Sequence, residues 1–299
     1  MAFLQDKVAV VTGGGQGLGR EEALALAAEG AIVVVNDLGG APEGGERPAD
    51  AVVREITVAG GRAEANFDDI STWDGAKSLI DQAFALTGRL DVLVCNAGIV
   101  RDRMLHKMSE AEWDAVLRVH LNGHYFPTRF AAERWREQAK ETGPVNARVI
   151  YTTSEAGLFG HLGQVNYSAA KAGITGMCFT VAQELDRVGV TANIISPRGR
   201  TPMTIGTFGE IGSQDDAFDV WDPANVAPMV VFLAREEAAQ ISGQVFVVYG
   251  GTVSRLTPWE ELGTIKADHR WESAELLDAI TTKLIPDLKA PHPEFPVEV

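Results

Sequence analysis

The chain has 299 residues, of which 45% are hydrophobic, and its 41 acidic and 26 basic side chains give a formal net charge of −15. This length suffices for one large α/β domain, while the negative charge argues against nucleic acid or an anionic membrane surface as a main partner. Cys95 and Cys178 each lie in an apolar stretch, so we expect no disulfide framework and a reducing compartment, the cytoplasm. We expect no metal site.

The N-terminal part of the sequence predicts a βαβ unit with a glycine-rich turn. Residues 7–12 and 31–37 are typical of buried strands, and residues 20–29 of a helix. Glycines between a strand and a helix let backbone amides reach a pyrophosphate without any Cβ in the way. A glycine-rich turn alone also occurs in hairpins, but the elements on both sides favour a dinucleotide site. The residues expected to bind the cofactor here are Gly13, Gln16, Gly17, Leu18 and Gly19.

Asp37 ends the second strand of this unit. A carboxylate at this place accepts hydrogen bonds from the hydroxyls of the adenosine ribose and repels a 2′-phosphate. We therefore predict NAD rather than NADP as the cofactor. The alternative is a solvated turn aspartate beside Leu38 and the two glycines that follow it.

Two further strands and a long helix follow. Residues 63–67 lead to Asp69 and Ile70, and residues 90–95 lead to Asn96, Ala97 and Gly98. From Glu110 onward, apolar residues at helical spacing place His120 and His124 on one stripe and Asn122 on the opposite face, unless Gly123 and Pro127 distort the helix.

Ser154, Tyr167 and Lys171 form a candidate catalytic set. Residues 149–151 predict a buried strand that ends just before Ser154, and Tyr167 and Lys171 are one turn apart in a segment rich in helix formers. A nearby ammonium favours phenolate over phenol, so Lys171 is expected to lower the pKa of Tyr167 from its ordinary value near 10. A Tyr and a Lys at this spacing are also common on surface helices, so the pair alone is weak support for catalysis.

Together these residues resemble the short-chain dehydrogenase/reductase family. The resemblance rests on Thr-Gly-x-x-x-Gly-x-Gly at residues 12–19, Asn-Ala-Gly at 96–98, and the Ser154, Tyr167 and Lys171 set. It implies a single-domain α/β fold of the doubly wound, Rossmann type with a mostly parallel sheet and helices on both faces. It also implies that Ser154, Tyr167 and Lys171 are catalytic, and that Tyr167 and Lys171 also contact the cofactor.

The same resemblance assigns further positions. It implies that Asp69 and Ile70 line the adenine pocket, that Asn96, Ala97 and Gly98 lie beside the cofactor, and that Pro197 and Gly199 flank the nicotinamide. His120 stands where many members carry a fourth catalytic residue, an Asn; it either holds a proton-relay water or is a core histidine. Arg198 replaces the family's usual glycine, and it either reaches a substrate phosphate or carboxylate or points to water.

Four stretches, at residues 34–40, 96–103, 118–121 and 163–171, are similar to the dehydrogenase part of the peroxisomal multifunctional β-oxidation enzymes. That resemblance implies oxidation of 3-hydroxyacyl-CoA thioesters with NAD. Two alternatives stay open: a reductase of 3-oxoacyl thioesters, steroids or polyketide ketones, and a cofactor-sensing or scaffold protein without chemistry.

The C-terminal part completes the expected fold. Residues 190–196 and 243–251 predict the last two parallel strands, and residues 201–222 a variable cover for a small-molecule substrate. We expect a catalytic domain over residues 1–252 and an extension over 253–299 with some helical periodicity. Small residues at 169, 170, 172, 173 and 176 suit close packing in a homo-oligomer, a dimer or tetramer.

Overall fold

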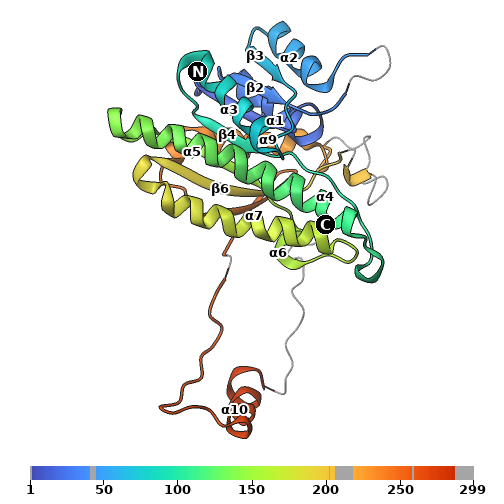
Figure 1. Cartoon of the computed structure of the whole chain (residues 1–299), viewed down its shortest axis with the longest axis vertical. Helices are drawn as coiled ribbons and strands as arrows, with labels where there is room; N and C mark the ends of the chain where they lie inside the picture. Colours follow the sequence, from blue (N-terminus) through green and yellow to red (C-terminus); the bar gives the residue numbers. More distant parts are fainter. Residues whose placement is uncertain (1, 41–44, 202, 206–217, 258, 287–299) are drawn as a thin grey trace. The chain divides into compact units, whose positions relative to one another are not determined.

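The computed structural model describes residues 2–40, 45–201, 203–205, 218–257 and 259–286. It divides into two compact units, residues 1–256 and residues 257–299. The first unit contains one eight-stranded sheet of order β3-β2-β1-β4-β5-β6-β7-β8 (Figure 1). The strands are β1 Val8–Thr12, β2 Ile32–Asn36, β3 Arg62–Asn66, β4 Val92–Cys95, β5 Ala147–Thr152, β6 Val190–Pro197, β7 Val245–Tyr249 and β8 Thr252–Leu256.

The pairs from β3 through β7 are parallel, which confirms the predicted doubly wound sheet. As predicted over residues 243–251, β7 is the last parallel strand, but one further strand follows it in the sheet. After Tyr249 the chain turns at Gly250 and Gly251, and β8 pairs antiparallel with β7. Residues of β8 alternate between partly buried and exposed, as in an edge strand with one face on the core.

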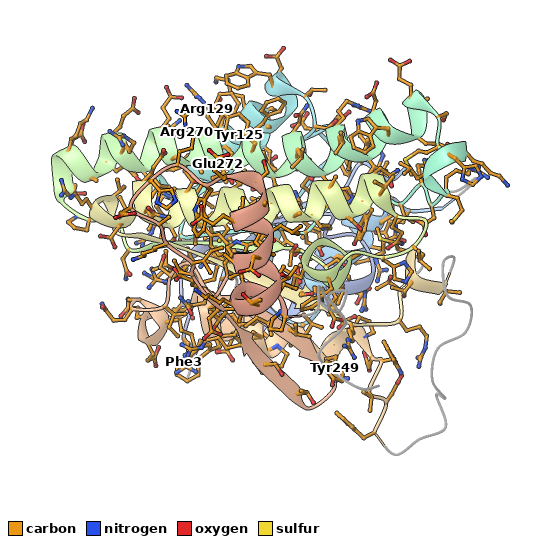
Figure 2. The ribbon with its side chains drawn as sticks, turned by 90° about the horizontal axis from the view of Figure 1, so that it is seen from below. Phe3, Tyr125, Arg129, Tyr249, Arg270 and Glu272 are labelled. Carbon is orange, nitrogen blue, oxygen red and sulfur yellow. The ribbon has the colours of Figure 1, made fainter. Side chains whose placement is uncertain are left out.

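Helices cover both faces of the sheet. They are α1 Gly17–Ala28, α2 Pro48–Val58, α3 Trp73–Thr87, α4 Glu110–Leu117, α5 Gly123–Thr142, α6 Glu155–Phe159, α7 Val165–Glu184 and α9 Ala227–Ala234. Successive strand residues point to opposite faces, so Val8 and Val10 pack with α3, α5 and α7, while Ala9 and Val11 pack with α1, α2 and α9. On the outer side of α5, Tyr125 remains 49% exposed (Figure 2).

A π-helical turn, Arg118–Asn122, separates α4 from α5. The sequence predicted a continuous helix with Asn122 on the face opposite His120, and named distortion as the exception. In the structure His120 is fully buried, while Asn122 donates from Nδ2 to the carbonyl oxygen of Ser71 at 3.5 Å. The two side chains therefore point to different surroundings.

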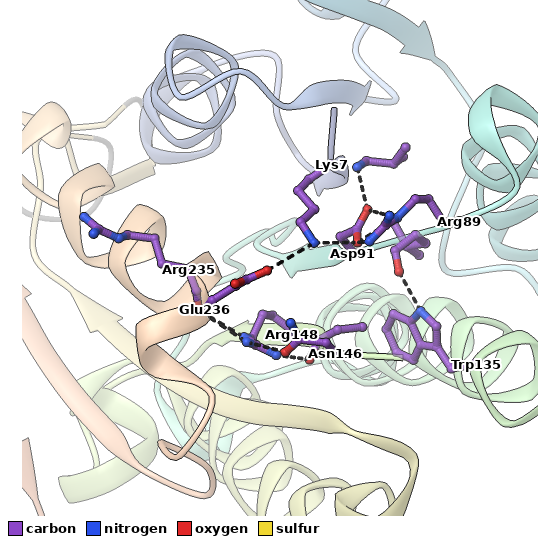
Figure 3. Close-up of polar contacts among 11 residues, drawn as sticks. Lys7, Arg89, Asp91, Trp135, Asn146, Arg148, Arg235 and Glu236 are labelled. Atoms are coloured by element: carbon purple, nitrogen blue, oxygen red, sulfur yellow. Dashed lines mark hydrogen bonds and ion pairs between the residues drawn. The ribbon is translucent and has the colours of Figure 1, made fainter. Parts of the chain in front are cut away.

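Polar side chains fasten the amino-terminal edge of the sheet (Figure 3). The carboxylate of Asp91, just before β4, accepts from the backbone amide of Val8 at 2.8 Å and lies 3.7 Å from Lys7 Nζ. Arg148, at the start of β5, is 2% exposed and donates to Asn146 Oδ1 at 2.8 Å. These bonds hold the amino edge, and the residues proposed for chemistry lie at the opposite edge.

The second unit is short. It contains α10, Ser273–Ala279, and a π-helical turn, Ile280–Leu284. Ala279 is buried, whereas Leu277 is 58% exposed. None of the helices in the described ranges combines the length and apolarity that crossing a membrane requires.

Candidate active site

Four neighbouring parallel strands bring the predicted segments to one edge of the sheet. The register aligns Thr12 of β1 with Cys95 of β4, and Cys95 with Tyr151 of β5. Thr152 of β5 aligns in turn with Ile195 of β6. The glycine turn, the Asn-Ala-Gly segment and Ser154 follow these strand ends, and Pro197 is the last residue of β6. In sheets of this type ligands bind outside the carboxyl ends of the strands.

The glycine turn leaves room where side chains would block a ligand. Gly13 and Gly17 have φ values of +64° and +55°, a region that favours glycine. A Cβ on Gly19 would lie 2.2 Å from the carbonyl oxygen of Gly13. Gln16 precedes α1 without a side-chain capping bond to the first-turn amides. The turn therefore fits the diphosphate of a dinucleotide, bound by backbone amides at a helix N-terminus.

Asp37 faces this turn. Its carboxylate accepts from the amide of Gly15 at 3.0 Å and from that of Gly39 at 2.8 Å. A Cβ on Gly15 would lie 2.7 Å from Asp37 Oδ2, so glycine is required for this approach. Asp37 is therefore held against the glycine turn. Because these two amides occupy only some of the lone pairs of its carboxylate, the others remain to accept hydrogen bonds from ribose hydroxyls.

Asp69 and Ile70 follow β3. Asp69 Oδ1 accepts from the amide and hydroxyl of Ser71 at 2.9 and 2.6 Å, and Arg118 Nη1 lies 3.4 Å from Oδ2. Burial raises the pKa of Asp69, but these bonds and the arginine charge outweigh burial and lower it overall. Ile70 is 6% exposed and packs in the core near Gly123. The place of Ile70 beside an adenine stays a prediction.

The Asn-Ala-Gly segment ties β4 to the glycine turn. The amides of Asn96 and Ala97 donate to Thr12 Oγ1 at 3.0 and 3.2 Å, and Asn96 Nδ2 donates to the carbonyl oxygen of Gly13 at 3.3 Å. A Cβ on Gly98 would lie 2.3 Å from His120 Cε1. The small residue at 98 thus makes room for a histidine.

The candidate catalytic side chains meet at the end of β5. Ser154 caps α6, with its Oγ accepting from the amide of Ala156 at 3.2 Å, and its side chain lies near Tyr167, whose pKa it lowers. Lys171 Nζ lies 5.6 Å from the centre of the Tyr167 ring and donates to the carbonyl oxygen of Thr152 at 2.6 Å. The structure therefore brings the predicted set together.

Gly157 is a residue of this site that sequence reasoning missed. A Cβ on Gly157 would lie 2.5 Å from Lys171 Cβ, so this glycine lets α6 pack directly on α7. Its position three residues after Ser154 is the signal that could have identified it.

The ionisation of the pair differs from the sequence prediction. Burial raises the pKa of Tyr167 to about 12, although the hydrogen bond with Ser154 lowers it. Burial also lowers the pKa of Lys171 to about 7. The prediction considered only the charge of Lys171 and left out the cost of burying both charged forms.

His120 packs edge-on against Tyr167, with ring centroids 5.2 Å apart and planes at 84°. Its Nε2 lies 2.8 Å from the carbonyl oxygen of Ile99, while Nδ1 has no hydrogen-bond partner among the described residues. Burial and the nearby Lys171 lower the pKa of His120 well below its ordinary value, so the ring is neutral. His120 is thus a buried neighbour of Tyr167, and among the described residues its Nδ1 keeps an unused hydrogen-bonding position.

Arg198 does not point to water, since its side chain is only 9% exposed. Its Nε and Nη2 donate to the two carboxylate oxygens of Glu155 at 2.6 and 2.7 Å, and its guanidinium lies 4.5 Å from the centre of the Tyr249 ring. Pro197 ends β6. A Cβ on Gly199 would meet Leu18 at 3.4 Å, so this loop lies against the glycine turn.

The family model for short chain dehydrogenases matches residues 7–208, which include the glycine turn, the Ser154, Tyr167 and Lys171 set and the end of β6. The chain belongs to the short-chain dehydrogenase family. The predicted family and fold are confirmed, and this short-chain dehydrogenase is an oxidoreductase of a family that uses nicotinamide cofactors.

Individual relatives support the narrower resemblance. The chain is 47% identical over 277 residues to the hydroxyacyl-CoA dehydrogenase ChsB1 of Mycobacterium tuberculosis. The aligned residues cover 91% of this chain and 87% of that protein. It is 40% identical over 263 residues to the peroxisomal multifunctional enzyme type 2 of Mus musculus, covering 87% of this chain and 34% of that longer protein. A crystal structure of a short chain dehydrogenase from Mycobacterium avium matches with a TM-score of 0.87 and 44% identity, over 99% of this chain and 100% of that one.

Proposed function

We propose that this short-chain dehydrogenase oxidises the 3-hydroxyl group of 3-hydroxyacyl-CoA thioesters with NAD. The observation that carries the proposal is the meeting of Ser154, Tyr167 and Lys171 at the edge of the sheet that also carries the glycine turn. The substrate class is supported by the similarity to the hydroxyacyl-CoA dehydrogenase ChsB1 over most of both chains.

When bound, the nicotinamide supplies the acceptor for the substrate hydride. Ser154 would hold the alcohol oxygen by a hydrogen bond, and Tyr167 would take the hydroxyl proton as a general base. Lys171 would place a positive charge beside the phenolate that forms. In the opposite direction the same side chains would serve ketone reduction, with Tyr167 as the proton donor.

The choice of NAD over NADP is supported by Asp37. Its carboxylate is held at the end of β2 against the glycine turn, where a 2′-phosphate would meet a negative charge. The cofactor-binding residues are then Gly13, Gln16, Gly17, Leu18, Gly19, Asp37, Asp69, Ile70, Asn96, Ala97, Gly98, Tyr167, Lys171, Pro197 and Gly199.

The test is absorbance of reduced nicotinamide with NAD or NADP and a ladder of 3-hydroxyacyl-CoA thioesters of increasing acyl length. We expect NAD-dependent oxidation, with kcat/KM highest for one acyl range. If the enzyme turned over only steroid or polyketide ketones, that substrate class would take the place of the 3-hydroxyacyl-CoA thioesters. Cofactor binding without turnover of any secondary alcohol would support a sensor on the same fold.

We also propose a cytoplasmic homo-oligomer, a dimer or tetramer. Ala169, Ala172, Gly173 and Gly176 form an exposed surface of small residues on α7, whereas Ala170 faces the core. Such a surface lets two helices approach closely. The oligomeric mass measured in solution by light scattering tests this, and a monomer at all concentrations would contradict it.

A further inference from the structure

Glu155 and Arg198 form a bidentate ion pair across the carboxyl ends of two neighbouring strands. The two bonds are 2.6 and 2.7 Å long, and each side chain is only 9% exposed. Glu155 directly follows Ser154 at the end of β5, and Arg198 directly follows Pro197 at the end of β6. β5 and β6 are parallel neighbours, so the pair fixes the two strand ends at a set distance.

The residue before Ser154 is fastened as well. The amide of Thr153 donates to the carbonyl oxygen of Ile195 at 2.8 Å, and its hydroxyl donates to the carbonyl oxygen of Lys171 at 2.9 Å. Both neighbours of Ser154 are therefore bound to other elements. Thr153 is bound to β6 and α7, and Glu155 is bound to Arg198, the residue after β6.

We propose that the Glu155–Arg198 ion pair is a positioning pair that holds the Ser154 hydroxyl in register with Tyr167 and with Pro197. A bidentate pair fixes both distance and orientation, and burial keeps water from competing for its donors and acceptors. The ring of Tyr249 under the guanidinium restricts Arg198 further. The proposal rests on the catalytic role proposed for Ser154.

The experiment compares Glu155→Gln, Arg198→Met and Arg198→Lys with the unmodified enzyme. Glu155→Gln keeps the side-chain size, and Arg198→Lys keeps the positive charge. We therefore expect these two variants to fold even if Arg198→Met does not. We expect kcat and kcat/KM to fall together by about 10- to 100-fold, because the hydrogen bond from Ser154 to the reacting oxygen stabilises the transition state more than the bound substrate. The dissociation constant of NAD, measured by fluorescence, should change by less than about twofold.

The double variant Glu155→Gln/Arg198→Met tests whether the two side chains act as a unit. It should lose no more activity than the worse single variant, because each change breaks the same contact. Multiplied losses would contradict a shared role.

Arg148→Met is the matched control, since it removes a buried arginine from the other end of β5 (Figure 3). It should lower the midpoint of thermal unfolding while kcat per NAD-binding site stays unchanged. If the Glu155 and Arg198 variants behave in the same way, the pair is only structural and the proposal is wrong.

Ser154→Ala separates this proposal from the proposed function. If Ser154→Ala keeps its kcat, the catalytic assignment of Ser154 fails. If Ser154→Ala loses activity while the Glu155 and Arg198 variants keep theirs, only the positioning proposal fails. In the Ser154→Ala background, Arg198→Met should cause no further loss, since the hydroxyl it positions is gone.

Discussion

Lys171 Nζ lies 5.6 Å from the centre of the Tyr167 ring, and both groups are packed among protein atoms that disfavour charge. The pKa of Lys171 is lowered to about 7 and that of Tyr167 is raised to about 12. The pair therefore holds both protons below neutral pH and releases the first proton near pH 7. With one proton fewer, a neutral amine beside the phenol is the main form at these pKa values, and the minor form, an ammonium beside a phenolate, holds the base that alcohol oxidation requires.

This titration predicts opposite pH profiles for the two directions. In the oxidation direction kcat/KM should rise as the pH increases through about 7, and in the reduction direction it should fall over the same range. Initial rates from pH 5.5 to 9 with saturating cofactor measure both profiles. A flat oxidation profile between pH 6 and 8 would contradict the assignment.

Lys171→Met should move the oxidation profile. The substitution removes the group that titrates near 7 and leaves the Tyr167 phenol, whose pKa is about 12. Oxidation at pH 7 should fall about 100-fold, and the rise in rate should shift to above about pH 9. An unchanged position of the rise would show that Lys171 does not take part in the titration.

Asp37→Ser should change the cofactor preference. Without the carboxylate, ribose hydroxyls lose an acceptor and a 2′-phosphate no longer meets a negative charge, so the ratio of kcat/KM for NAD over NADP should drop at least about tenfold. Asp74→Asn, an exposed carboxylate in the first turn of α3, serves as the control and should leave the ratio unchanged. An equal effect of both changes would point to overall charge instead.

Gly98→Ala should displace His120. The added Cβ would lie 2.3 Å from His120 Cε1, so the buried ring must shift away from its contact with Tyr167. We expect a loss of about 1 to 3 kcal/mol in the free energy of unfolding and a lower kcat. Gly251→Ala, where none of the described residues lies within 4 Å of the new Cβ, should be nearly neutral in both measurements.

Glu22→Gln should stabilise the protein in a pH-dependent way. Glu22 in α1 is fully buried, its carboxylate has no hydrogen-bond partner in the described part of the chain, and burial raises its pKa to about 8 from an ordinary value of 4.5. The folded state thus binds this proton more tightly than the unfolded state. The contribution of Glu22 to the free energy of unfolding is fully present below about pH 4.5 and is lost as the pH rises through about 8.

Urea unfolding at pH 5 and pH 8 tests this prediction. The stabilisation by Glu22→Gln should be small at pH 5 and on the order of a few kcal/mol at pH 8. Glu21→Gln, its partly exposed and ion-paired neighbour, should show no such increase with pH. A gain that does not depend on pH would rule out ionisation as the cause.

Much of the fold and site could be predicted because each feature has a local sequence pattern. Buried strands such as Ile32–Asn36 consist mostly of apolar residues, the cofactor turn shows as glycines after such a run, and Tyr167 and Lys171 share a helical turn. The resemblance to known relatives placed Ser154, whose role no local pattern indicates.

The features that were missed depend on contacts between distant segments. The Glu155–Arg198 pair joins residues 43 positions apart, and the π-helical turn at Arg118–Asn122 accompanies the packing of His120 against Gly98. The raised pKa of Tyr167 comes from burial, which a sequence does not show at a single position. The edge strand β8 was missed as well, because its alternation between partly buried and exposed residues is known only from the structure.

The most direct test of the account is hydride transfer by Tyr167→Phe. The variant keeps the aromatic ring but lacks the hydroxyl that would accept the substrate proton. With NAD binding confirmed by fluorescence, kcat for a 3-hydroxyacyl-CoA thioester should fall by at least about 100-fold across the pH range. Turnover close to that of the unmodified enzyme, with NAD bound, would contradict the central claim that this phenol performs the proton transfer.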